Sequence, residues 1–241
     1  MISIAYRVDL ADVANKLKSL LGASDVDCSK RPDVTVVVGG DGTLLETIHR
    51  YPCVLDSLVV HIGGGRINFY RSVRIGEMKL EEIAKRVLSS EFNVVELPTI
   101  DAGCTAVNEV VIRNVDYRKL LSFKIVGGTQ IVSGRADGVI VATPQGSTGY
   151  AISTWGPIVD YRLAAFVISF LAPYTLHLRP LVVPQEPLEV LTAQEAELTC
   201  DGYDVQRGRS FHIRRGGRNL KLVVFGEYDF YERVSARLLS Q

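Results

Sequence analysis

The feature that most constrains the fold is an uninterrupted β-branched run at residues 34–38, which ends directly in Gly39-Gly40-Asp41-Gly42-Thr43. Such a run is typical of a strand buried on both faces of a sheet. Two further apolar runs, at residues 2–8 and 58–62, alternate with helical apolar spacing at residues 10–21, 43–49 and 79–89. This strand–helix alternation predicts a parallel sheet covered by helices.

The pattern changes near residue 92, beyond which short β-rich segments dominate. Strands are expected at residues 106–113, 122–126, 138–142, 166–171, 188–191 and 220–225, with one helix among them at residues 147–154. A closing helix is expected at residues 232–239. We therefore predict an α/β protein: an N-terminal, Rossmann-like α/β domain (residues 1–91), a β-rich domain (residues 92–225) and a C-terminal tail (residues 226–241).

Composition narrows the class of protein. The 241 residues are 47% hydrophobic, and 27 basic residues balance 27 acidic ones. This balance argues against a general binder of nucleic acid or of acidic membranes. No apolar run reaches the length of a membrane span, and the N-terminus lacks the pattern of a signal peptide. We expect a soluble protein of the cytoplasm.

The cysteines carry little positive signal. Cys28, Cys53, Cys104 and Cys200 form no Cys-x-x-Cys pair and lie near no histidine in the sequence. Zinc binding therefore has little support. We predict buried free thiols in a reducing compartment.

The glycine-rich segment around Asp41 is the strongest local signal of function. A strand that ends in glycines and leads into a helix is a common phosphate-binding element, because backbone N–H groups and the helix N-terminus face the anion. A carboxylate at that place repels phosphate unless a Mg²⁺ ion or a hydroxyl proton lies between them, as phosphoryl transfer to an alcohol requires. The alternative is structural: Asp41 caps the helix on a glycine turn.

Two further segments are candidates for ligand binding. Asn108 and Glu109 interrupt an apolar strand predicted at residues 106–112, where a bound ribose or base would supply polar partners. The alternative is a strand end at a domain boundary. Residues 137–153 read as a strand, a Pro/Gly turn and a helix capped by Ser147, which suits recognition of a polar or anionic ligand. The alternative is an ordinary strand–turn–helix unit.

These three signals, in this order and spacing, resemble the NAD kinase family. The resemblance covers residues 34 to about 184, and residues 137–157 are its most specific part. Residues 171–181, LAPYTLHLRPL, are similar to the family's Pro-His-x-Leu-x-x-Arg-Pro-Leu stretch, and Asp201-Gly202 matches a further step. The resemblance implies an N-terminal α/β domain, a β-rich domain, a site between them and a tail folded back on the first domain.

The resemblance also implies roles for individual residues. Asp41 is the catalytic aspartate at the 2′-hydroxyl of the adenosine ribose, with Gly42 against the ligand. A phosphate-donor loop consists of Gly39, Gly40, Gly42 and Thr43. The other expected NAD-binding residues are Asn108, Glu109, Arg135, Asp137, Thr148, Gly149, Tyr150, Ala151, Ile152, Ser153 and Ala172.

Some positions depart from the family pattern. Gln145 stands where the family usually has Thr or Ser, and Gly149 replaces an alanine. Tyr174 replaces a histidine, and Glu46 replaces a basic or small residue. Residues 63–70 are similar to the family's glycine-rich loop, but Asn68 replaces its last glycine.

The function expected from the resemblance is phosphorylation of NAD to NADP. The donor is ATP, another triphosphate or polyphosphate, and a divalent cation such as Mg²⁺ arrives with it, since no dedicated metal site is apparent. We expect a homo-oligomer, a dimer or tetramer, with no nucleic-acid or membrane partner. Two alternatives remain open: a kinase of the same superfamily for a lipid or another hydroxyl, and a non-catalytic dinucleotide sensor.

Overall fold

The chain divides into two compact units. The computed structural model describes residues 1–64 and 68–239. Unit 1 comprises Met1–Leu97 and Arg218–Gln241, and unit 2 comprises Pro98–Gly217. Of the glycine-rich loop predicted at residues 63–70, Gly65, Arg66 and Ile67 lie outside the described residues.

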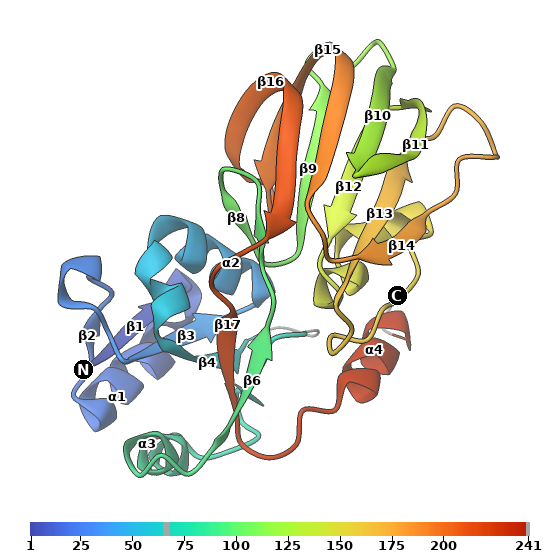
Figure 1. Ribbon diagram of the computed structural model, residues 1–241. Coiled ribbons are helices and arrows are strands. Elements are labelled where there is room, and N and C mark those ends of the chain that lie inside the picture. The colour runs from blue at the N-terminus through green and yellow to red at the C-terminus, as the bar shows by residue number, and fades with distance from the viewer. Residues whose placement is uncertain (65–67, 240–241) are drawn as a thin grey trace. The chain divides into compact units, whose positions relative to one another are not determined.

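Unit 1 is an α/β unit built on a seven-stranded sheet in its described part (Figure 1). The strand order is β2-β1-β3-β4-β17-β6, with β5 paired to β4. Strands β1, β3, β4 and β17 are mutually parallel and β6 is antiparallel. The strands are β1 (Ile2–Tyr6), β2 (Ser24–Asp25), β3 (Val34–Gly39), β4 (Leu58–Gly63), β5 (Val73–Arg74), β6 (Asn93–Leu97) and β17 (Leu220–Val224). The helices are η1 (Val8–Leu10), α1 (Ala11–Leu21), η2 (Cys28–Lys30), α2 (Asp41–Arg50), η3 (Pro52–Asp56), α3 (Leu80–Leu88) and α4 (Phe230–Leu239).

The core of unit 1 explains why strand β3 is β-branched from Val34 to Val38. Val36 and Val38 pack in one cluster with Leu17 of α1 and Ile83 of α3. Val37, between them, is also fully buried. Because side chains alternate along a strand, Val37 points to the opposite face. The sheet is therefore covered on both sides, which leaves the strand ends as the places where polar groups can stand.

The predicted domain boundaries place two strands wrongly. Both β6 and β17 fall inside the β-rich domain predicted at residues 92–225, yet they pair with the sheet of unit 1. Strand β17 lies between β4 and β6, with Leu222 opposite both Val59 and Val95. An apolar run shows that a strand will form, but not which sheet it will join.

Unit 2 is β-rich. Its described residues form a ten-stranded sheet with the order β14-β13-β12-β9-β15-β16-β7-β8, and β10 pairs with both β11 and β15. The strands are β7 (Ile100–Asp101), β8 (Thr105–Ala106), β9 (Glu109–Asn114), β10 (Leu121–Gly127), β11 (Thr129–Ala136), β12 (Gly138–Ala142), β13 (Ala165–Leu171), β14 (Leu181–Pro184), β15 (Leu188–Cys200) and β16 (Tyr203–Arg215).

Strand β12 is buried on both faces. Val139 and Val141 belong to the larger core cluster of unit 2, whereas Ile140 and Ala142 join a second cluster that includes Ala151. The second cluster brings the segment after β12 back over the sheet. This packing fixes the position of the predicted recognition segment.

The helix predicted at residues 147–154 is wrong in form. The chain makes two short 3₁₀ helices, η4 (Gln145–Thr148) and η5 (Tyr150–Thr154), which are separated at Gly149. Ser147 does not cap a helix: its hydroxyl donates to the carbonyl oxygen of Pro144 at 2.5 Å. The non-helical backbone of Gly149 (φ −83°, ψ −128°) interrupts the helix.

The prediction of free thiols is also wrong. Cys28 is disulfide-bonded to Cys53 within unit 1, and Cys104 to Cys200 within unit 2. Their separations of 25 and 96 residues follow no sequence pattern that identifies the pairs. Disulfides persist in oxidising compartments and also inside hyperthermophilic cells.

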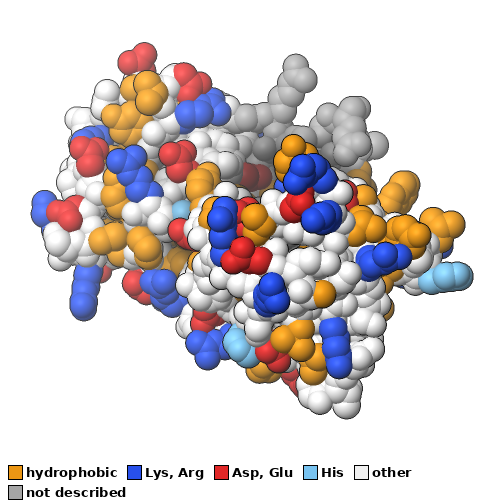
Figure 2. Space-filling view, turned by 90° about the horizontal axis from the view of Figure 1, so that it is seen from above, with side chains coloured by type: hydrophobic (Ala, Val, Ile, Leu, Met, Phe, Trp, Pro, Cys, Tyr) orange, Lys and Arg blue, Asp and Glu red, His pale blue; other side chains and the backbone are white. Residues whose placement is uncertain are grey.

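The surface is mixed in charge, with basic and acidic side chains interspersed on the face shown in Figure 2.

Candidate active site

The site in unit 1 forms where β3 passes into α2. Gly40 is the N-cap residue of α2, and its carbonyl oxygen accepts hydrogen bonds from the amides of Thr43 and Leu44 at 3.0 and 3.2 Å. Asp41 is the first residue of the helix and lies inside it, after the N-cap position. The structural alternative for Asp41, a helix cap, is therefore wrong.

The Asp41 carboxylate is instead held by a loop distant in sequence. Oδ2 accepts the amide N–H of Phe69 at 2.8 Å, and Oδ1 accepts that of Tyr70 at 3.2 Å. A carboxylate has about four lone-pair sites, so two amides leave acceptor capacity unused. The Asp41 side chain is 21% exposed. It is thus oriented by the protein and still accessible to a further group.

His61, on β4, lies behind Asp41 and is completely buried. Its Nε2 is 3.0 Å from the carbonyl oxygen of Gly39, so Nε2 carries the proton. Its Nδ1 is 3.9 Å from Oδ1 of Asp41. Burial lowers the pKa of His61, and the nearby charge of Asp41 only partly opposes this shift. The imidazole is therefore neutral near pH 7 and adds no positive charge beside the carboxylate.

The glycines of this segment serve different ends. A Cβ at Gly39 would lie 2.4 Å from Oγ1 of Thr43, so the packing of Thr43 requires glycine there. Among the residues that the structure describes, and apart from its chain neighbours and the backbone of α2, a Cβ at Gly42 would meet no heavy atom within 4 Å. Contacts within the protein therefore do not explain Gly42. Open space beside the carboxylate is what the close approach of a ligand needs.

The site in unit 2 is arranged around Asn108 and Glu109. The strand predicted at residues 106–112 is interrupted: β8 ends at Ala106 and β9 begins at Glu109. The reason is Asp201, whose carboxylate accepts the amides of Val107, Asn108 and Glu109 at 2.7, 2.8 and 3.0 Å. These amides are thereby withdrawn from the sheet ladder. The pair stands at a strand start that the turn at Asp201 holds in place.

Gly146 and Gly149 allow the segment after β12 to approach this pair. A Cβ at Gly146 would lie 2.0 Å from the carbonyl oxygen of Asn108, and one at Gly149 would lie 2.7 Å from Oε2 of Glu109. That same Oε2 accepts the amide of Tyr150 at 3.2 Å. An alanine at position 149 would therefore require the Glu109 carboxylate to shift.

One cavity of unit 2 collects three of the predicted residues. Asp137, Tyr150 and Ala172 line it together with Arg113 and other residues, and its volume is about 360 Å³. Arg113 donates to the hydroxyl of Tyr150 at 2.6 Å. Ala172 has a left-handed backbone (φ 40°), which is costly for a residue with a Cβ. The cavity thus combines polar and charged side chains with apolar lining, as small-molecule pockets do.

Comparison with known proteins identifies the family. The model of the ATP-NAD kinase C-terminal domain matches residues 107–225. A protein named NAD kinase from Cellvibrio japonicus is 34% identical over 226 residues, which cover 86% of this chain and 74% of that protein. The chain belongs to the NAD kinase family. A second relative of that name, from Thermosipho melanesiensis, is 28% identical over 99% of this chain and 96% of its own.

The fold agrees with NAD kinases of known structure. A crystal structure of an NAD kinase from Archaeoglobus fulgidus in complex with ATP superposes with a TM-score of 0.83 at 23% identity, over 100% of this chain and 99% of that one. A yeast NADH kinase complexed with NADH gives a TM-score of 0.80 at 18% identity, over 99% and 87% of the two chains. At these identities the likeness shows the fold of a NAD kinase.

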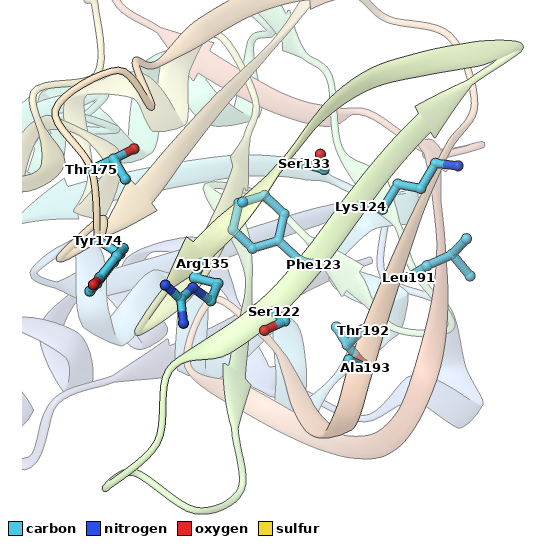
Figure 3. Close-up of a pocket in the computed structure, with 11 residues that line it drawn as sticks. Ser122, Phe123, Lys124, Ser133, Arg135, Tyr174, Thr175, Leu191, Thr192 and Ala193 are labelled. Carbon is cyan, nitrogen blue, oxygen red and sulfur yellow. The ribbon is translucent and has the colours of Figure 1, made fainter.

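Not every residue expected from the family pattern lies in the Asp137 cavity. Arg135 lines a different, more open cavity, where its guanidinium stacks 4.2 Å from the centre of the Tyr174 ring (Figure 3). The amide of Tyr174 also donates to the carbonyl oxygen of Arg135 at 2.9 Å. Tyr174, which replaces the family's histidine, is therefore the residue that orients Arg135 in this chain.

The segment of η4 and η5 is only partly available to a ligand. Thr148 is buried and its hydroxyl donates to Gln145, while Ala151 is fully buried in the second core cluster. Ile152 is half-buried and Ser153 is exposed. Thr148 and Ala151 thus shape this surface from within, and Tyr150 and Ser153 present side chains on it.

Three contributors to the sites were not identified from the sequence. The loop residues Phe69 and Tyr70 act through backbone amides, which leave no mark on residue type. Asp201 stands in an Asp-Gly step that is similar to one in the family, but no role followed from that similarity. Arg233, described below, lies 164 residues from its carbonyl partner at Phe69.

Two further structural features of the described residues concern metal-binding clusters and membrane-spanning helices. Within residues 1–64 and 68–239, no three His, Cys, Asp or Glu side chains group in a way that could hold a metal ion. Among the same residues, no helix is both long and apolar enough to cross a membrane.

Proposed function

We propose that this NAD kinase family member transfers a phosphoryl group from ATP or polyphosphate to the 2′-hydroxyl of the adenosine ribose of NAD, giving NADP. The observation that carries the proposal is the Asp41 carboxylate. It stands at the start of α2 in the glycine segment, does not cap the helix, and is oriented by two amides while 21% exposed.

In this mechanism Asp41 accepts the proton of the 2′-hydroxyl as the oxygen attacks the terminal phosphorus of the donor. The bond to the leaving phosphate oxygen breaks as the new P–O bond forms. General-base catalysis of this kind contributes about 10²–10⁴-fold. The N-terminal amides of α2 and the open space at Gly42 suit an anionic group beside the carboxylate.

The residues of unit 2 recognise the dinucleotide in this proposal. Asn108 and Glu109 bind the ribose, while Asp137, Tyr150 and Ala172 line the cavity for another part of NAD. The backbone of the Asn108–Glu109 pair is fixed by Asp201 before any ligand arrives. Pre-organisation of this kind reduces the entropy lost on binding.

The divalent cation belongs to the donor in this proposal. Mg²⁺ usually keeps several waters and is bound largely by substrate phosphates, which fits a chain whose described residues contain no metal cage. When bound, the cation neutralises charge on the transferred group. Full activity in excess chelator would contradict this assignment.

We also place the enzyme in the cytoplasm as a dimer or tetramer, as expected for the family. Two disulfides within a cytoplasmic enzyme would be typical of a hyperthermophile. Sedimentation of the purified chain tests the assembly, and a monomer at micromolar concentration would contradict it.

The test of function is direct. The purified full chain is incubated with NAD, Mg²⁺ and either ATP or polyphosphate, and NADP is measured with a specific dehydrogenase. Diacylglycerol with labelled ATP is the matched alternative acceptor. NADP formation with no labelled lipid supports the proposal. NAD binding with no turnover by any donor would indicate a sensor, and labelled lipid would indicate the other kinase class.

A further inference from the structure

The C-terminal helix α4 carries a buried cation that contacts the loop holding Asp41. Arg233 is only 7% exposed. Its Nη1 donates to the carbonyl oxygen of Phe69 at 2.7 Å and to that of Arg71 at 3.0 Å. Its guanidinium also lies 4.3 Å from the centre of the Tyr228 ring. Both hydrogen bonds end on main-chain carbonyls, so the cation acts on the path of the loop backbone.

One peptide group connects Arg233 to Asp41. The carbonyl between Phe69 and Tyr70 accepts from Arg233, and the N–H of the same peptide group, on Tyr70, donates to Oδ1 of Asp41 at 3.2 Å. A cation at the carbonyl polarises the peptide and strengthens its N–H as a donor. Arg233, this peptide and Asp41 thus form a continuous hydrogen-bonded chain.

Packing supports the same connection. The Phe69 ring lies edge-on to Phe230 of α4 at 5.7 Å, and both rings are almost fully buried. Burial lowers the pKa of Arg233, and the charge of Asp41 is among those that oppose this shift. The two side chains therefore attract each other across the loop. Helix α4 holds residues 69–71 through both an apolar contact and a charged one.

We propose that Arg233 is a positioning residue for phosphoryl transfer: through the Phe69–Tyr70 peptide it holds the Asp41 carboxylate in the orientation that accepts the hydroxyl proton. The proposal rests on the proposed role of Asp41. Arginine suits this position because its planar guanidinium lies over the Tyr228 ring while Nη1 donates to both carbonyls, whereas the ammonium of lysine is a point charge on a flexible stem.

The consequence is specific to turnover. Without Arg233 the peptide loses its polarising partner, and the carboxylate loses its fixed orientation. Displacing a catalytic group by about 1 Å can cost on the order of 10²-fold in rate. NAD affinity, which the proposal assigns mainly to residues of unit 2, should change little.

The experiment uses the full-length chain with Arg233→Met and Arg233→Lys, and Ser235→Ala as the control on the same helix, where the side chain is exposed. Melting temperature, kcat and the KM for NAD are measured for each. Arg233→Met is expected to lower kcat about 10-fold or more, with the KM within about twofold. Arg233→Lys should recover part of kcat, and Ser235→Ala should match the wild type.

Coupling to Asp41 separates positioning from general destabilisation. If Arg233 acts through Asp41, adding Arg233→Met to Asp41→Asn should lower kcat by no more than about twofold further. Independent, multiplying losses would overturn the proposal, and so would unchanged kcat in Arg233→Met. Should Arg233→Met fail to fold, the same cycle with Arg233→Lys decides. A wild-type chain that makes no NADP would refute the proposed function itself, a result distinguishable from all of these.

Discussion

The two units use the same interaction, an aspartate that accepts backbone amides, in opposite ways. In unit 1 the candidate catalytic group is itself the acceptor: Asp41 takes the amides of Phe69 and Tyr70. In unit 2 the acceptor is Asp201, which is not among the expected ligand contacts. It accepts the backbone amides of Asn108 and Glu109 and so holds these two residues in place. A group that must exchange a proton is held with two contacts and remains accessible. Residues that only bind a ligand can be fixed through their backbone, here by three amides that donate to one carboxylate.

The second difference concerns how each support is anchored. The loop that holds Asp41 is secured by Arg233 from the far end of the chain. The turn that holds Asn108 is secured covalently, because Cys200, the neighbour of Asp201, is bonded to Cys104. We infer that a substitution in unit 1 can shift the loop by a small amount without unfolding it. In unit 2 we expect a substitution at Asp201 to disrupt the whole turn.

The largest effect is expected from Asp201→Asn. Asparagine tolerates the left-handed backbone here (φ 51°), but its amide group cannot accept hydrogen bonds at all three positions. Hydrogen bonds to charged groups contribute about 1.5–3 kcal/mol each, so we expect a loss of about 3 kcal/mol in unfolding free energy and weaker NAD binding. Urea unfolding and calorimetry measure both. Asp204→Asn, at the same φ and exposed, is the control and should change neither.

Alanine substitutions at Gly39 and Gly42 should distinguish a glycine needed for packing from one needed for the approach of a ligand. Gly39→Ala forces a Cβ against Thr43 and should destabilise the fold by about 1–3 kcal/mol. The Cβ of Gly42→Ala points into open space among the described residues, and alanine is the better helix former, so its melting temperature should be unchanged or higher. Its NAD kinase activity should nevertheless fall. Full activity in Gly42→Ala would mean that no ligand approaches this position.

Acid should weaken unit 1 through His61. Its folded pKa lies below the ordinary value of about 6.5, so between those two values the unfolded chain binds the proton first. Stability contributed by this group is complete above about pH 6.5 and falls by up to about 1.4 kcal/mol per pH unit below it. His61→Gln should flatten the slope measured by urea unfolding from pH 7.5 to 5. His212→Gln, 81% exposed, should leave it unchanged, and an equal slope in both variants would contradict the account.

The smallest effects are expected from the side chains that unit 2 displays. Asn108→Ala and Glu109→Ala leave the amides on Asp201, so neither should unfold the protein. Each lost ligand hydrogen bond should cost about 0.5–1.5 kcal/mol, or roughly threefold to tenfold in NAD affinity. Glu109→Ala also removes the partner of the Tyr150 amide and should melt slightly earlier. Unchanged affinity with a large drop in melting temperature would make the pair structural.

The sequence predicted the parts of the fold that depend on local pattern. Strand β3 and the turn after it could be predicted because burial and turn formation each depend on residues that are neighbours in the sequence. The pairing of β17 with β4 could not be predicted, since apolar strands of either unit look alike. The break of η4 and η5 at Gly149 depends on contact with Glu109, which only the tertiary structure reveals.

The candidate site likewise contains residues that could be predicted from the sequence and residues that could not. Asp41, Asn108 and Asp137 stand in motifs and could therefore be predicted from the sequence as site residues. Their supports act through carbonyls and amides from 28 to 164 residues away, and main-chain groups carry no residue signature. The disulfides were missed because their spacing is arbitrary and the composition suggested a reducing compartment.

The measurement that tests the central claim most directly is the turnover of Asp41→Asn alongside its affinity for NAD. The substitution keeps the shape of the side chain and removes the carboxylate charge. The account predicts a loss of about 10²–10⁴-fold in NADP formation, with NAD binding by calorimetry within about threefold of the wild type. A melting curve checks that the Phe69–Tyr70 loop stays in place. A variant that keeps more than about half its activity, or that fails to bind NAD while still folded, would contradict the assignment of Asp41 as the base.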